Sequence, residues 1–228
     1  MSTVATSGAG YSGRHPGWPV ALGPLQVRTG RVELRPVQLR DGGQWSAIRL
    51  RDQAHLEPWE PTTPGTWQQR HSSAEWPGRW MLLRGAARKG AALPFAMTVD
   101  GRLAGHVMIG NVLREPLLSG YVGYWCDRAL TGGGVTTAAV ALAVDHCFAQ
   151  PHAGGAGLHR LEATVRPENV ASRRVLEKLG FREEGLFRRY LDVAGAWRDH
   201  LCYALTTEDL AGAGLAERLV AGGRAERV

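Results

Sequence analysis

The sequence predicts a single mixed α/β domain, and three observations support this prediction. From Gly120 onward the chain reads strand, glycine loop, helix, strand, helix and hairpin, an order typical of a mixed sheet flanked by helices. Before it, two β-rich runs in PFAMTVDGRLAGHVMIGNVL are joined by Asp100-Gly101, the strongest short hairpin signal in the chain. Hydrophobic residues make up 44% of the 228 residues, enough for one core, and no internal repeat or second domain is visible.

The first part of the chain is predicted to form strands and then helices. Residues 1–24 are rich in Gly, Ser and Pro, so we expect a poorly ordered leader. LQVRTGRVELRPV alternates as a strand or hairpin does, and Asp41 lies near the N-cap of a helix that reaches about His55. The proline-interrupted loop LEPWEPTTPG follows. Residues 67–89 are ambiguous, with one or two helical segments on which Trp76 and Trp80 are expected to be exposed.

The second part has clearer boundaries. Gly180 stands where a left-handed helix C-cap is expected, with Phe181 beyond it to close the motif hydrophobically. We expect strands at 120–127 and 159–165, helices from Val135 and over 171–180, strands at 181–192 and 196–205 around a turn at 193–195, and a short helix with a frayed tail at the end. The predicted organisation is thus a leader at 1–24, a domain at 25–210 and a C-terminal helix and tail at 211–228.

Composition and charge narrow the classes of partner. The net charge is +6, and all but two of the basic residues are arginine, the lysines being Lys89 and Lys178. No run of basic residues interleaved with aromatics is visible, so direct nucleic-acid binding is not expected. The charge fits a phosphate-bearing ligand, or an acidic partner such as a ribosomal particle.

Cysteine usage and the N-terminal segment indicate a cytoplasmic protein. Cys126, Cys147 and Cys202 are odd in number and far apart, without a partner at metal-ligand spacing, so we expect reduced, buried thiols and no metal site. No apolar run is long enough to cross a bilayer, and the first residues lack the features of a secretory signal.

Three consecutive glycines, Gly132 to Gly134, separate a predicted strand from the helix that begins at Val135. Their backbone N–H groups are unobstructed by side chains, and the helix N-terminus adds about half a positive charge, so the segment predicts a phosphate site built mainly from main chain. A flexible connection is the alternative. Neither the Lys-Ser/Thr of a P-loop nor a G-x-G-x-x-G fingerprint is present.

These motifs together resemble the acetyl-CoA-binding half of the GNAT superfamily of N-acetyltransferases. The residues that carry the resemblance are GYWCDRALTGGGVTTAAVALAVDHCF, HRLEATVRPENVASRRVLEKLGFREEGLFRRYL and WRDHLCYAL. More narrowly, the chain is similar to bacterial ribosomal-protein N-terminal acetyltransferases of the RimJ/RimL type, with PWEPT in the first half, over roughly Val32 to Leu210. The resemblance implies acetyl-CoA as co-substrate and a sheet splayed between the GYWC and LEATV strands, where pantetheine would slot in like an extra strand.

The resemblance also assigns the residues that bind acetyl-CoA. The family's pyrophosphate loop has Gln or Arg, then Gly three residues on, then Gly or Ala two later; here Ala129 replaces the first. Asn169 belongs to an Asn-x-x-Ser/Ala element that contacts pantetheine, although an ordinary N-cap is the alternative. The assigned residues are Trp125, Cys126, Gly132, Gly133, Gly134, Val135, Thr136, Thr137, Asn169 and Ser172.

Acetyl transfer to an amine needs a base, because an ammonium group cannot attack a thioester. A carboxylate acting directly or through water is expected. Glu60, in the proline-rich loop, and Glu162, on the strand that faces the gap, are the candidate bases. A strand N–H near Trp125 or Cys126 would stabilise the developing oxyanion.

The leaving thiolate needs a proton donor. The family usually supplies a tyrosine five residues before the phenylalanine of the Gly-Phe pair, but this chain has Leu176 there. Ser172 is then the nearest hydroxyl, a role that the RimL-type resemblance also suggests.

The leading expectation is acetylation of a protein N-terminal α-amine, with alanine of a ribosomal protein as the acceptor, by a monomer or homodimer. The alternatives are acetylation of a small amine, such as a polyamine, amino acid or antibiotic, and a non-catalytic acyl-CoA-binding or ribosome-binding module. The acceptor pocket is expected to come from the weakly patterned region between Leu56 and Lys89.

Overall fold

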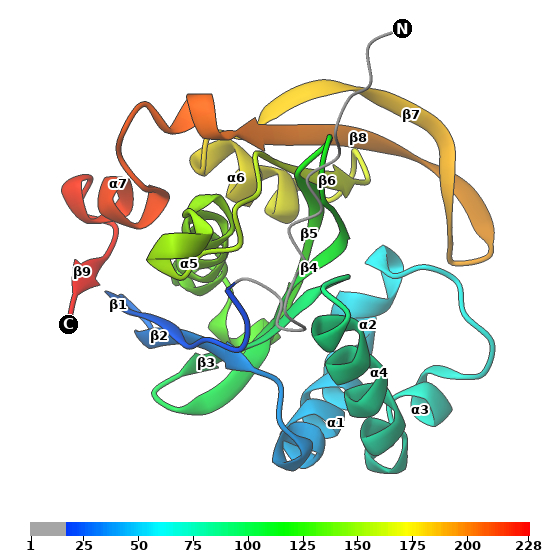
Figure 1. The fold of residues 1–228 in the computed structure, drawn as a ribbon. Coiled ribbons are helices and arrows are strands. Elements are labelled where there is room, and N and C mark those ends of the chain that lie inside the picture. Colours follow the sequence, from blue (N-terminus) through cyan, green and yellow to red (C-terminus); the bar gives the residue numbers. More distant parts are fainter. Residues whose placement is uncertain (1–16) are drawn as a thin grey trace, which may run out of the picture.

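The computed structural model describes residues 17–228, which form a nine-stranded sheet with helices on both faces (Figure 1). The strand order is β7-β8-β6-β5-β4-β3-β2-β1-β9, and only β5 and β6 pair in parallel. The strands are β1 Leu22–Val27, β2 Gly30–Pro36, β3 Leu93–Val99, β4 Arg102–Leu113, β5 Ser119–Cys126, β6 Arg160–Val165, β7 Arg182–Val193, β8 Ala196–Thr206 and β9 Glu226–Arg227. The α-helices are α1 Gly42–Arg51, α2 Gln53–Leu56, α3 Trp67–Arg70, α4 Trp76–Arg88, α5 Val135–Phe148, α6 Val170–Lys178 and α7 Leu215–Ala221.

The two faces of the sheet carry separate cores. Helix α5 packs on β1, β2, β4 and β5, whereas α4 packs on β3 and α1 on β4 from the opposite side (Figure 1). Strand β3 is buried at every position because its side chains alternate between the two faces. Phe95 and Met97 join the large core beneath α5, and Ala96 joins a smaller core with Trp45 and Trp76.

Both predicted hairpins form. Asp100 and Gly101 have φ of +49° and +77°, the positive values that a two-residue turn of the I′ type requires. Ala194 and Gly195 connect β7 to β8 with φ of +53° and +74°. The β7–β8 hairpin is long and curves across the top and right of the molecule in Figure 1, toward the loop that follows α2.

The two ends of the described chain are more ordered than the sequence predicts. Residues 1–16 of the expected leader lie outside the described residues, but β1 begins at Leu22 and the ring of Trp18 packs edge-on against Phe95 at 5.2 Å. The short helix predicted near the C-terminus is α7, and after it β9 pairs with β1, where the sequence predicts a frayed tail. The side chain of Asp145 on α5 accepts hydrogen bonds from Leu215 N and Ala216 N at 2.6 and 2.9 Å, which fixes the start of α7.

The expectation that Trp76 is exposed is wrong. Its side chain is 1% exposed, its ring centroid lies 5.1 Å from that of Trp45, and its indole N–H donates to Gln38 O at 3.1 Å. Trp80 is half-buried and donates to Val37 O at 3.2 Å. The two tryptophans therefore fasten α4 to the segment after β2, and the small core on that face depends on them.

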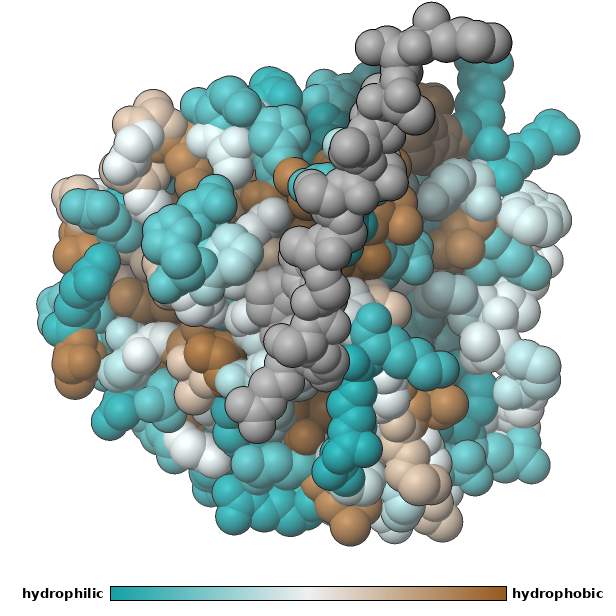
Figure 2. Space-filling model, viewed as in Figure 1, coloured by the Kyte–Doolittle hydropathy of each residue, from teal (hydrophilic) through white to brown (hydrophobic). Residues whose placement is uncertain are grey.

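Hydrophilic side chains cover most of the molecular face shown in Figure 2, and hydrophobic residues occur among them as separate patches. Large exposed hydrophobic residues lie on different elements, such as Leu82 on α4 and Trp197 on β8. None of the helices formed by residues 17–228 combines the length and the apolar character that a bilayer crossing requires.

Candidate active site

Strands β5 and β6 separate in the middle of the sheet. They pair at only three positions, Ser119↔Arg160, Gly120↔Leu161 and Tyr121↔Glu162. Beyond Tyr121, β5 remains paired with β4 only, and β6 with β8 only. The outer main-chain groups of β5 there have no strand partner, so an extended ligand can pair with them. The predicted central splay is confirmed.

Strand β4 accounts for the separation. Its register shifts opposite Met97 and Thr98 of β3, and again between Gly110 and Leu113 opposite β5. Irregularities of this kind bend a strand and increase its twist. Strand β5 pairs with β4 on both sides of the second shift, so the bend in β4 is shared by β5 next to the point where its pairing with β6 ends.

The glycine loop opens helix α5 at the end of β5. Gly132 and Gly134 have φ of +76° and +92°, a region that side chains other than glycine strain to occupy. Gly134 is the N-cap residue of α5, and no side chain caps the helix. The N–H groups of the first turn are therefore free for a ligand, as the sequence predicts, and the helix dipole favours an anion there.

Charged side chains hold this loop in place from behind. The guanidinium of Arg28 donates to Gly132 O at 3.1 Å. Asp52, at the end of α1, accepts from Arg128 N at 2.9 Å, and Arg51 bridges Asp52 to Asp127. Because these contacts already order the loop, a ligand that binds its N–H groups loses little affinity to the entropy cost of ordering it.

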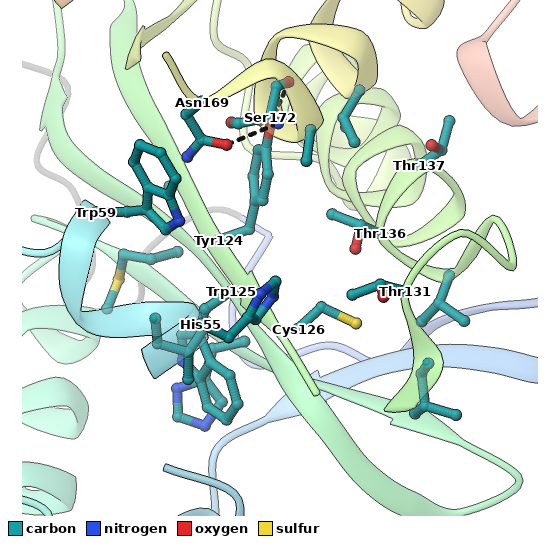
Figure 3. Close-up of a pocket in the computed structure, with 18 of the residues that line it drawn as sticks. His55, Trp59, Tyr124, Trp125, Cys126, Thr131, Thr136, Thr137, Asn169 and Ser172 are labelled. Carbon is teal, nitrogen blue, oxygen red and sulfur yellow. Dashed lines mark hydrogen bonds between the residues drawn. The ribbon is translucent and has the colours of Figure 1, made fainter. Parts of the chain in front are cut away.

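Helix α6 faces the glycine loop across the gap (Figure 3). The side-chain oxygen of Asn169 caps α6 by accepting from Ser172 N at 3.1 Å. The hydroxyl of Tyr124, on β5, donates to Ser172 O at 3.2 Å and lies 2.9 Å from Ser172 Oγ. Burial raises the pKa of Tyr124, so its hydroxyl stays protonated at neutral pH and holds the Ser172 hydroxyl at the gap.

Glu60 lies on the other side of β5 in a buried charge cluster. It forms an ion pair with Arg49, whose side chain is 4% exposed and lies between the rings of Trp67 and Trp125, 4.7 and 5.1 Å from their centroids. Arg49 Nη2 also lies 2.9 Å from His71 Nε2. The buried guanidinium of Arg49, itself held by His71, thus fixes the orientation of Glu60 at the edge of the gap.

His71 is a neutral member of this cluster. Its Nδ1 lies 2.9 Å from Trp67 O, which can only accept, so Nδ1 carries the proton and Nε2 accepts from Arg49. Burial and the positive charge of Arg49 lower the pKa of His71 to about 4. The imidazole is therefore an acceptor at neutral pH and adds no charge near Glu60.

The loop that carries Glu60 is fastened to the distant β7–β8 hairpin. Thr62 N donates to Asp192 O at 2.8 Å, Thr62 Oγ1 donates to the Asp192 carboxylate at 2.8 Å, and Gly195 N donates to Thr62 Oγ1 at 2.8 Å. Trp59, in the 3-10 turn Glu57–Trp59, lies under the guanidinium of Arg166 at 5.4 Å. These contacts close one wall of the acceptor side.

The glycine loop, β5, α6 and the Glu60 loop enclose one cavity of about 580 Å³. Of the predicted site residues, the structure brings ten to its wall: Glu60, Trp125, Cys126, Gly132, Gly134, Val135, Thr136, Thr137, Asn169 and Ser172. Gly133 is absent from the wall; a Cβ there would overlap the side chain of Thr29, so this glycine permits close packing behind the loop.

Glu162 also lies outside the cavity wall. Its carboxylate accepts from Arg160 Nε at 2.7 Å, and Arg160 bonds in turn to Glu184. Between the two candidate bases, the geometry therefore favours Glu60.

Several lining residues were not predicted from the sequence. They are His55, Leu56, Trp59, Arg79, Leu83, His106, Met108, Gly123, Leu130, Thr131, Ala171, Arg174, Val175 and Lys178. Arg174 and Lys178 repeat at i and i+4 on α6, a spacing that places them on one helix face and could have signalled a basic wall. The acceptor-side residues come from α2, α4 and β4, and no sequence motif links these elements.

The three thiols are free and buried. Burial raises the pKa of Cys126, which lines the cavity, to about 11, so the thiol is protonated at neutral pH. Within residues 17–228, no three His, Cys, Asp or Glu side chains are grouped closely enough to hold a metal ion.

Comparison with known proteins identifies the family. Residues 31–182 match the model of the acetyltransferase (GNAT) domain. The structure described as Mycobacterium smegmatis RimJ in complex with CoA-disulfide is 54% identical, with a TM-score of 0.90, and the match covers 94% of this chain and all of that one. The family resemblance and the fold predicted from the motifs are confirmed.

Curated relatives agree with this assignment. The Escherichia coli [ribosomal protein uS5]-alanine N-acetyltransferase is 28% identical over 81% of this chain and 92% of its own length. The Bacillus subtilis probable N-acetyltransferase YjcK is 41% identical over 110 residues, and this match covers 48% of the chain and only 58% of the relative.

Proposed function

The chain belongs to the acetyltransferase (GNAT) domain family and is an acetyl-CoA-dependent N-acetyltransferase, and we propose that its acceptor is the α-amine of a protein N-terminus. One observation carries this proposal. A single cavity joins an uncapped helix N-terminus, an unpaired strand edge and an oriented carboxylate, Glu60. These three features are suited, in that order, to bind the pyrophosphate of acetyl-CoA, to pair with its pantetheine arm and to bind the acceptor amine.

The donor would lie across the two sides of the gap. The N–H groups of Gly134, Val135 and Thr136 are suited to the pyrophosphate, because no side chain occupies the start of α5. Beyond Tyr121 the unpaired edge of β5 is suited to the amide groups of pantetheine. Asn169 caps α6 through its oxygen, which leaves the amide N–H₂ as a donor toward the gap.

The chemistry we infer uses three groups of this chain. Glu60 orients the amine and accepts its proton, directly or through a water. A main-chain N–H at Trp125 or Cys126 stabilises the oxyanion as the amine attacks the thioester carbonyl. When the C–S bond breaks, Ser172 Oγ donates a proton to the thiolate and takes up the second proton that the attacking nitrogen loses as it becomes an amide, and Tyr124 keeps that hydroxyl in place.

An α-amine is the acceptor that best suits this machinery. Its pKa of about 7.7 to 8.0 leaves a substantial minority neutral at pH 7, whereas a lysine amine near 10.4 is almost wholly charged. The site has a single carboxylate as its base, with Leu176 at the usual tyrosine position, and therefore suits the α-amine, which is easier to deprotonate. The relative described as a ribosomal protein uS5-alanine N-acetyltransferase favours an N-terminal alanine of a ribosomal protein.

The test offers the protein acetyl-CoA with peptides that begin with alanine, with lysine-containing peptides and with polyamines, while free thiol release is followed. Mass spectrometry of the products is expected to find acetyl groups on the α-amine of the alanine peptides. Acetylated lysine side chains or polyamines, with N-terminal amines untouched, would refute the proposed acceptor. Binding of acetyl-CoA with no thiol release on any amine would indicate a non-catalytic module.

A further inference from the structure

Arg79 lies in the acceptor part of the cavity without a direct polar partner. It projects from α4 and lines the same cavity as Glu60 and Trp59. Its guanidinium carbon lies 5.3 Å from the ring centroid of Trp45, and within residues 17–228 it makes neither a hydrogen bond nor an ion pair with protein atoms. Its five N–H donors are therefore available to whatever enters the cavity.

The arginines nearby are engaged differently. Arg49 binds Glu60 and His71, and Arg70 donates to Thr63 Oγ1 at 2.8 Å and to Gly65 O at 3.2 Å. Because Glu60 is held by Arg49, it acts on Arg79 only through space. The acceptor pocket thus contains one oriented carboxylate and one cation that is free to bind a ligand.

A peptide N-terminus complements this pair of charges. Its α-amine is suited to Glu60, and its first carbonyl oxygen lies three bonds from that nitrogen, through Cα and the carbonyl carbon. A guanidinium is a planar donor suited to such an oxygen, and a hydrogen bond to a charged group is stronger than one between neutral groups. A polyamine has no oxygen at that place and would bring a second positive charge toward Arg79.

We propose that Arg79 binds the first carbonyl oxygen of the acceptor and thereby selects α-aminoacyl groups over simple amines. This inference rests on the proposed function and adds the residue that reads the acceptor main chain. Arg79 then mainly lowers the Michaelis constant for the acceptor, while Glu60 accepts the proton of the amine.

The experiment compares three acceptors: an alanine peptide, the same peptide with its first peptide bond replaced by a trans-alkene that lacks the oxygen, and putrescine. It measures kcat/KM for the wild-type protein, Arg79→Gln and the control Arg84→Gln. Arg84 lies on the same helix with its guanidinium 5.1 Å from the ring centroid of Trp80, and it does not line the cavity. Calorimetry with coenzyme A verifies that each variant still binds the donor side.

Arg79→Gln is expected to lower kcat/KM for the alanine peptide by about 10- to 100-fold, as for the loss of one charged hydrogen bond. The alkene peptide should change little between wild type and Arg79→Gln, and Arg84→Gln should match the wild type on every acceptor. Equal losses on both peptides, or no loss on the normal one, would overturn the role of Arg79 while leaving the proposed function standing. A wild-type protein that acetylates putrescine but no N-terminal peptide would overturn the proposed function and this inference together.

Discussion

The ion pair between Arg49 and Glu60 allows activity and stability to be separated. Removing one partner of a buried pair costs about 3 to 5 kcal/mol when both charges are fully desolvated. Here Arg49 is 4% exposed but Glu60 is 29% exposed, so water lowers the cost. We expect Glu60→Gln to reduce the free energy of unfolding by about 2 kcal/mol, because Arg49 remains buried with only neutral acceptors, His71 and the new amide oxygen, and without a counter-charge.

The same substitution should lower the turnover rate by roughly two to four decades, as for loss of a general base, and leave acetyl-CoA affinity nearly intact. Adding Arg49→Met removes the unpaired charge and places a flexible apolar side chain between Trp67 and Trp125. The double variant is therefore expected to recover stability to within about 1 kcal/mol of the wild type, but not its rate.

Urea denaturation measures the stabilities, and thiol release under saturating acetyl-CoA measures the rates. Glu57→Gln is the matched control, because Glu57 lies in the same loop with a carboxylate that is 42% exposed and 3.9 Å from Arg70. The double variant regaining the wild-type rate would refute the base role of Glu60 and make its effect structural. A fully active Glu60→Gln would instead move the base to Glu162 or to water.

Three further outcomes are expected. Gly134→Trp should weaken acetyl-CoA binding far more than Asn169→Ala in calorimetry, because Gly134 has φ of +92° at the start of α5. Asn169→Ala removes only one helix cap and one hydrogen bond to the ligand, of about 1 kcal/mol each. Equal affinities of the two variants would exclude the site. The pKa of His71 is about 4 in the folded protein and about 6.5 in the unfolded chain, so its protonation favours the unfolded chain. The free energy of unfolding is therefore highest above pH 6.5 and falls as the pH drops toward 4. The wild type should lose about 3 kcal/mol more than His71→Gln between pH 7 and pH 4 in urea titrations, and parallel curves would contradict this sign. Trp76→Ala should cost about 3 to 5 kcal/mol, since the ring is 1% exposed; a surface-like change below about 1 kcal/mol would show that the smaller core does not depend on it.

The donor half of the site could be predicted from the sequence because its parts are contiguous. A phosphate site made from main chain needs glycines and a helix start within a few residues, and Gly132 to Val135 provide both. The Asn169 cap and the Asp100-Gly101 turn are likewise local, since the residues that make each contact lie within a few positions of one another. Contacts between residues that are close in the sequence produce motifs that can be recognised from the sequence alone.

The acceptor half was decided by tertiary packing. Arg49 lies on the predicted first helix, but His71 and Arg79 lie in the region that the sequence leaves ambiguous, and only packing brings Arg49 and His71 to Glu60 in one charge cluster. Trp76 illustrates the same limit, because the core that buries it is assembled from α1, α4 and the β sheet rather than from one periodic helix face. The sequence by itself therefore determined the fold and the family, and it located the glycine loop at the start of α5 that we propose for the pyrophosphate, because the motifs behind these predictions are short and local. The choice of Glu60 over Glu162 and the free cation at Arg79 depend on desolvation and on contacts between distant segments, which only the folded chain creates.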